Sequence, residues 1–117
     1  MQYNRLIVIA RTAQTYFSEI LSAEPQIFDD KVRLLFIDDS FMDIRYPMNS
    51  KYSFHWRSAS NMFRVDTAPH HKNVSTYPRH IHIGDLVIAD TLTSFDNTIE
   101  DNVKNVLNYV RRNLLTT

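Results

Sequence analysis

Cysteine is absent from this chain of 117 residues, and its absence excludes several kinds of site. Without thiols there is no disulfide framework, no thiolate nucleophile and no zinc site with sulfur ligands. The sequence also lacks any apolar run near the roughly 20 residues that span a bilayer, and its first residues show no signal-like cleavage region. We therefore expect a cytoplasmic protein that has no membrane partner.

Glycine occurs once, at Gly84. One glycine cannot build the glycine-rich loops that bind nucleotide phosphates, nor the GxSxG turn of serine hydrolases, so those routes to function are excluded. We find no linker, repeat or low-complexity segment. Apolar residues make up 44% of the sequence, enough for a packed interior, and the length fits one domain over residues 1–117 with one core.

The chain has no excess of charge of either sign, because 13 basic residues balance 13 acidic ones. Overall charge therefore gives no sign of a nucleic-acid binder, and any basic patch must be local. Nine of the 13 basic residues are arginine. The planar guanidinium group suits bidentate contact with phosphate or carboxylate, and it also forms ordinary salt bridges.

Apolar residues recur at helical spacing near both ends of the chain. The first helix is bounded by Pro25, and its predicted stripe is Leu6, Ala10, Ala13, Phe17 and Ile20. Ile7 and Ile9 lie off this stripe, where they could meet a partner protein or another copy of the chain. The stripe of the last helix is Ile99, Val103, Val106, Leu107, Val110 and Leu114, and Asp96 is its expected N-terminal cap.

Between the helices the pattern changes to strict alternation, which predicts strands at 31–38, 41–47, 51–57, 62–66 and 80–85. Residues 86–89 are either a further strand or an extension of the last one. We predict an α+β fold, an antiparallel meander of four to five strands with N- and C-terminal helices packed on one face. The opposite face would carry polar side chains, namely Asp43, Arg45, His55, Arg57, Arg64, Asp66, His80 and His82.

Four of the five histidines lie between His70 and His82, in a turn-rich segment that also contains Arg79. Solvation alone explains many polar faces of antiparallel sheets. A metal site is a second reading, because His80 and His82 would point to one side of a strand, with His71 or Asp66 as a third ligand. The positive charge of neighbouring arginines opposes that reading.

A third reading, which we prefer, is metal-independent cleavage of RNA without a cofactor. Histidine can act as the base that activates a 2′-hydroxyl or as the acid that protonates the leaving oxygen, and arginine can stabilise charge on the phosphoryl oxygens. We predict that His70 or His71 shares this work with His80 or His82. The predicted substrate-binding residues are Arg57, Arg64, Asp66, Arg79 and His55. The aromatic candidates for stacking on a base are Tyr77, Tyr52 and Trp56, although we expect Trp56 in the core.

The segment 51–85 resembles the TumE-like family of toxins from prokaryotic toxin–antitoxin systems. Its members carry an aromatic strand, then (F)R(Y/V/I)D(N/T)xxHH, then (T)(F/Y)PHHxH. The matching residues here are Phe63-Arg64-Val65-Asp66, Pro69-His70-His71 and Thr76-Tyr77-Pro78-Arg79-His80-Ile81-His82. Thr67 replaces the common asparagine, and Arg79 replaces the first histidine of PHHxH, which fits a phosphate-facing site better than a metal site.

The resemblance implies a growth-inhibiting toxin that a partner antitoxin neutralises. Ribonuclease activity is our inference from the residues rather than from the family. A non-enzymatic module that docks RNA or a protein is the alternative function, and a metal-dependent enzyme with histidine ligands is a third.

Overall fold

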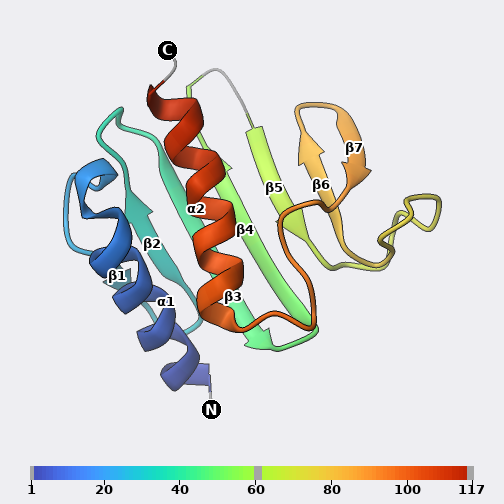
Figure 1. Ribbon diagram of the computed structural model, residues 1–117, viewed down its shortest axis with the longest axis horizontal. Coiled ribbons are helices and arrows are strands. Elements are labelled where there is room, and N and C mark those ends of the chain that lie inside the picture. The colour runs from blue at the N-terminus through green and yellow to red at the C-terminus, as the bar shows by residue number, and fades with distance from the viewer. Residues whose placement is uncertain (1, 60–61, 116–117) are drawn as a thin grey trace.

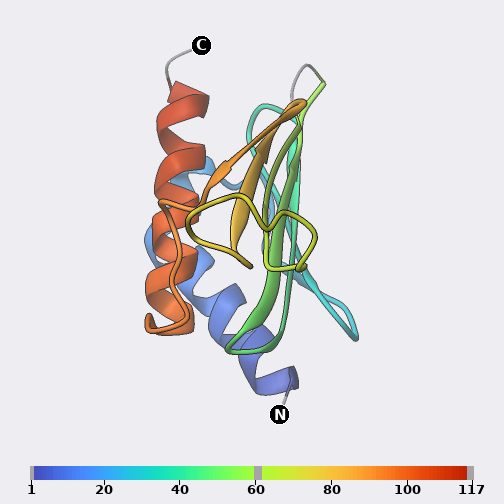
Figure 2. The same ribbon diagram turned by 90° about the vertical axis from the view of Figure 1, so that its right-hand side faces the viewer.

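The computed structural model describes residues 2–59 and 62–115 and consists of two layers, a sheet and a pair of helices (Figure 1). Figure 2 shows both helices on one side of the sheet. The predicted α+β meander with terminal helices on one face is confirmed, but the sheet has seven strands in sequence order. The elements are α1 Gln2–Phe17, η1 Ser18–Ile20, β1 Gln26–Ile27, β2 Val32–Leu35, β3 Phe41–Met48, β4 Lys51–Arg57, β5 Met62–Asp66, β6 His80–Ile83, β7 Leu86–Ala89 and α2 Ile99–Leu115.

The two strands beyond the predicted five lie at the edges of the sheet. The strand β1 has two exposed residues that pair with β2, and two residues are too few to show an alternating period. The strand β7 is separate from β6 because Gly84 adopts a φ of 58° in the turn between them, a conformation that glycine takes without strain. Ile83 then pairs with Leu86, and His80 pairs with Ala89.

The helix α1 packs on the sheet through Leu6, Ile9, Ala13 and Phe17, all of which are buried. The prediction that Ile9 lies off the packing face is wrong, since Ile9 is fully buried. The spacing from Leu6 to Ile9 and Ala13 follows one helical face as well as the predicted spacing through Ala10 does. Of the two residues set aside for a partner, Ile7 alone keeps part of its side chain exposed.

The helix α2 buries Val103, Val106, Leu107 and Val110 against the sheet, as its periodicity predicts. Its cap is Thr98 rather than Asp96, because the helix begins at Ile99 and the Asp101 amide donates to Thr98 Oγ1 at 3.0 Å. Both helices thus cover the same face of the sheet, and no helix among the described residues is long and apolar enough to cross a bilayer.

Strand register confirms the predicted polar face on the side that the helices leave open. One row across β3, β4, β5 and β6 pairs Asp43, His55, Arg64 and His82. The next row pairs Arg45, Ser53, Asp66 and His80. Because facing residues of adjacent strands project from the same side of a sheet, these two rows place cations, carboxylates and imidazoles on one surface.

Candidate functional site

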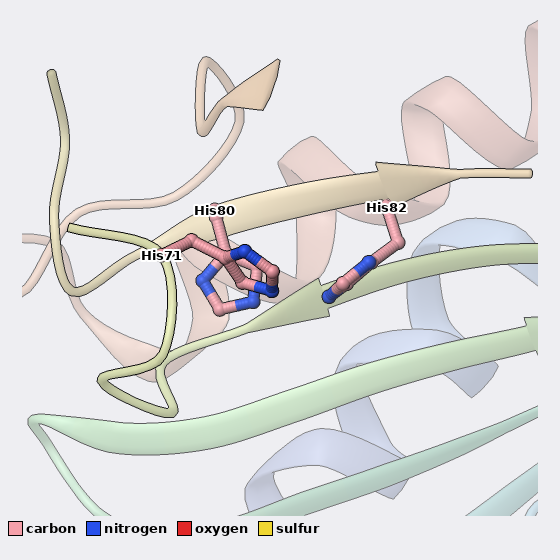
Figure 3. A group of neighbouring side chains, drawn as sticks. All are labelled: His71, His80 and His82. Carbon is pink, nitrogen blue, oxygen red and sulfur yellow. The ribbon is translucent and has the colours of Figure 1, made fainter. Parts of the chain in front are cut away.

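Three imidazole rings meet beside β6 on the polar face (Figure 3). His80 and His82 project from β6, and His71 approaches them from the loop of residues 67–79. The ring centroids of His71 lie 4.7 Å from His80 and 5.2 Å from His82, and those of His80 and His82 lie 4.8 Å apart. One ring nitrogen from each residue lies within 4.8 Å of the other two. We call these three residues the histidine cluster.

The loop that carries His71 is fastened at both ends. Thr67 is buried, and its hydroxyl accepts from the Tyr52 amide at 3.1 Å and donates to the Tyr52 carbonyl at 3.3 Å. Near the other end, Thr76 Oγ1 donates to the Arg79 carbonyl at 2.6 Å and accepts from the Asp90 amide at 2.8 Å. The sheet thereby fixes where His71 lies, although the loop has no regular secondary structure.

His80 is the buried member of the cluster, with 1% of its surface exposed. Its Nδ1 lies 2.9 Å from the Pro78 carbonyl oxygen. Because a carbonyl oxygen only accepts, Nδ1 is the donor, and the neutral ring then carries no proton on Nε2. In this neutral tautomer, Nε2 is the nitrogen with a free lone pair.

Burial and neighbouring positive groups disfavour the charged form of two imidazoles on this face. Burial lowers the pKa of His82, and the nearby His80 and His71 lower it further. Burial also lowers the pKa of His55, with additional lowering by Arg57 and Arg64. The Nε2 atom of His55 is buried and has no hydrogen-bond partner among the described residues.

Arg64 and Asp66 lie beside the cluster on β5. The Arg64 Nε atom is 3.0 Å from Asp66 Oδ2, an ion pair without the alignment of a hydrogen bond. Asp66 also accepts from the Ala68 amide at 3.0 Å. The carboxylate of Asp66 thus balances the charge of Arg64 and supports the first turn of the loop.

A cleft of about 580 Å³ extends over the same face from the ends of β3, β4 and β5 to the start of the loop. Its lining includes three cationic side chains, Arg45, Lys51 and Arg64, together with Ser53 and Asp66. The sequence prediction did not name Arg45 or Lys51 as binding residues. The row that joins Arg45, Ser53 and Asp66 could have indicated Arg45, whereas Lys51 carries no such signal because it begins its strand.

The structure brings together part of the predicted site. His71, His80 and His82 meet, and Arg64, Asp66 and His55 share their face. Arg57 lies at the far end of β4 from Lys51, about 20 Å away at the usual rise per residue, and His70 is an exposed loop residue outside the cluster.

Arg79 is turned toward the other side of the sheet. Its Nη1 lies 3.2 Å from Asp90 Oδ2 and also donates to the Thr93 carbonyl, and its guanidinium lies over the Phe95 ring. Two of the predicted stacking residues are also turned inward. Tyr52 is buried, and Trp56 packs against the core, whereas Tyr77 is exposed.

Comparison with known protein families gives a match to this chain. The family model described as Toxin TumE matches residues 6–114, nearly the whole chain. No curated protein and no solved structure matches the chain. The family motif that the sequence analysis identified lies in β5, the loop and β6. The family model supports that resemblance, and its match extends across both helices and all seven strands. The chain belongs to the TumE toxin family, and it is the toxin component of a toxin–antitoxin system.

Proposed function

We propose that this toxin acts by cleaving RNA on the open face of its sheet. One observation carries the proposal: the cleft with Arg45, Lys51 and Arg64 in its lining reaches the loop that brings His71 to the histidine cluster. Cations that can neutralise phosphates and imidazoles that can transfer protons thus share one surface. The phosphate groups of a single RNA strand, spaced along an extended backbone, suit a cleft of this kind.

We assign the roles of the three clustered histidines from the exposure of their side chains. His71 and His82 are half-buried, and each can contact a substrate as base or acid. His80 is almost fully buried and its Nδ1 is engaged by Pro78, so it orients the other two rings. Of the four predicted catalytic histidines, we therefore assign substrate contact to His71 and His82.

Arg64 lies beside the cluster, because it pairs with His82 across β5 and β6. We assign it to the reacting phosphate, where a fixed guanidinium stabilises charge that develops on the oxygens. Arg45 and Lys51 would bind neighbouring phosphates in the cleft. Tyr77, with 42% of its surface exposed, remains the candidate for stacking on an unpaired base.

A cleavage assay tests this proposal. Purified toxin is incubated with total RNA and with a defined single-stranded RNA, each with and without EDTA. We expect cleavage by the parent protein and by Asn73→Ala, an exposed change in the same loop. His82→Ala and His71→Ala should each lower the rate at least 100-fold, the loss typical of a missing acid or base.

Each result assigns a different function. Cleavage that persists in EDTA supports acid–base chemistry by the imidazoles alone, as the sequence predicted. Cleavage that EDTA abolishes supports a histidine-ligated metal. RNA binding by the parent protein without cleavage would replace the enzyme with a binding module, and full activity of His82→Ala would overturn the assignment of the site.

A further inference from the structure

The histidine cluster has the form of a metal site. Three imidazoles from two segments converge, and the nitrogens that could bind an ion lie within 4.8 Å of one another. Nitrogens that share one tetrahedral zinc ion lie about 3.4 Å apart, as follows from Zn–N distances near 2.05 Å. The required contraction is at most about 1.4 Å, which small rotations of the side chains can supply. We propose that His71, His80 and His82 bind one divalent transition-metal ion of the zinc class.

The environment of His80 supports this proposal independently of the distances. A histidine that binds a metal through one nitrogen usually donates its other N–H to a carbonyl or carboxylate, which fixes the tautomer and the ring orientation. His80 makes this contact through Nδ1 to the Pro78 carbonyl oxygen at 2.9 Å. Its burial leaves little room for a substrate, whereas an ion needs only the lone pair of the other ring nitrogen.

The sequence argument against a metal was the charge of the neighbouring arginines, and the structure removes most of it. Arg79 points to the opposite side of the sheet and pairs there with the fully buried Asp90. Arg57 is on β4, two strands from β6 in the sheet. Arg64 stays close, but Asp66 lies 3.0 Å from it and offsets its charge.

Three protein ligands leave at least one coordination position open, as in catalytic rather than structural zinc sites. His71 and His82 are only partly buried, so this position is accessible from solvent. An ion there could polarise a phosphate oxygen or a water molecule. With the ion bound, His71 and His82 are ligands, so the ion and its water would replace these two imidazoles in the acid–base role that the proposed function gives them. That role in RNA cleavage rests on the proposed function, whereas binding of the ion does not.

Zinc binding is measured on toxin that carries no polyhistidine tag, after chelator treatment and dialysis. Calorimetric titration with Zn²⁺ alone should show one equivalent bound by the parent protein. His71→Ala and His82→Ala should weaken binding at least tenfold, while circular dichroism confirms that they remain folded. His70→Ala is the matched control, because it removes an imidazole from the same loop but not from the cluster, and its zinc affinity should equal that of the parent.

Cobalt gives a second readout, since Co²⁺ should develop a visible spectrum with the parent and with His70→Ala but not with His71→Ala. The proposal is overturned if the parent binds no zinc, or if His70→Ala weakens binding as much as His71→Ala does. Zinc binding without RNA cleavage would retain the metal site and refute the proposed function. Full cleavage by zinc-free toxin in EDTA would retain the proposed function and show that the metal has no role in it.

Discussion

Arg79 and His80 are neighbours in the chain, yet their side chains lie on opposite sides of the sheet. His80 joins the histidine cluster on the open face, and Arg79 reaches Asp90 and the Thr93 carbonyl. The Thr93 hydroxyl in turn contacts the hydroxyl of the buried Tyr52 at 2.6 Å, which places this group of residues on the core side. The sequence motif PRHIH therefore contributes side chains to both sides of the sheet, and the Arg79 guanidinium is paired with Asp90 inside the protein.

We predict that Arg79→Ala mainly lowers stability. Asp90 is fully buried, and removal of the cation leaves a buried carboxylate without its ion pair, a change that costs about 3 kcal/mol. Urea denaturation measures the free energy of unfolding. Zinc affinity of the protein that remains folded should match that of the parent.

The matched control for Arg79 is the pair Arg79→Met and Asp90→Asn, tested singly and together. If the ion pair dominates, the double variant should be more stable than the sum of the single losses allows. An Arg79→Ala variant with unchanged stability but no RNA cleavage would instead return Arg79 to the substrate-binding role that the sequence suggested.

The sequence was sufficient for the sheet because strand alternation is a local signal. The predicted strands 51–57 and 62–66 coincide with β4 and β5, and parity alone placed His55, Arg64 and His82 on one face. The same parity rule also assigns Arg79 to the side opposite His80. The sequence prediction grouped Arg79 with the site because it interpreted the histidine segment as one unit.

Other parts of the site depend on contacts between distant residues, which no local pattern reveals. The choice of His71 over His70 is determined by the turns of the loop between Thr67 and Arg79. The cationic cleft forms where Lys51, at the start of β4, meets Arg64 and Pro69. These residues are far enough apart in sequence that their proximity depends on the register and on the fold of the loop.

We predict that the cleft binds RNA mainly through phosphate contacts. In a His82→Ala background, which prevents cleavage, Arg45→Ala and Lys51→Ala should each weaken binding to a single-stranded RNA. Each should also reduce the slope of log affinity against log salt by about 0.7, the value for one phosphate contact on a single strand. Fluorescence anisotropy at several salt concentrations measures both quantities.

Arg112→Ala is the control for the cleft, since it removes the same charge from the exposed side of α2, across the sheet from the cleft. It should leave both affinity and slope unchanged. Equal losses for Arg112→Ala and Arg45→Ala would show that total charge, and not the cleft, determines RNA binding.

We predict that the Thr67 hydroxyl holds the loop in position. Thr67→Val keeps the shape but leaves the buried Tyr52 amide and carbonyl without their side-chain partner, which should cost about 1–3 kcal/mol. Amide hydrogen exchange should become faster in residues 68–74, and zinc affinity should fall because His71 is less well placed.

Thr67→Ser retains the hydroxyl and should restore slow exchange and zinc binding. If Thr67→Val leaves both exchange and zinc affinity at the level of the parent, the loop is held by its other contacts, such as those of Thr76.

We predict that Tyr52 makes the protein less stable at alkaline pH. Burial, together with the charge of Asp90, raises the pKa of Tyr52 to about 12 despite its bond to Thr93. In the unfolded chain the pKa is near 10, so between these values the unfolded state binds fewer protons and stability falls as pH rises. Ionisation of Tyr52 in the unfolded chain should lower the free energy of unfolding by about 1 kcal/mol between pH 8 and pH 11.

Tyr52→Phe isolates that contribution. The variant should be less stable than the parent at pH 8, since it loses the bond to Thr93, and the difference should shrink by about 1 kcal/mol at pH 11. A difference that stays constant between the two pH values would show that folding does not raise the pKa of Tyr52.

The helices cover one side of the sheet only, so alternate residues of a central strand face the interior and the exterior. Along β5, Phe63 and Val65 serve the interior, while Arg64 and Asp66 serve the exterior. In a screen of all substitutions along this strand, the effect of a substitution would thus alternate from one residue to the next. Changes at 63 and 65 would reduce the amount of protein in the cell, whereas changes at 64 and 66 would leave abundant toxin that no longer stops growth.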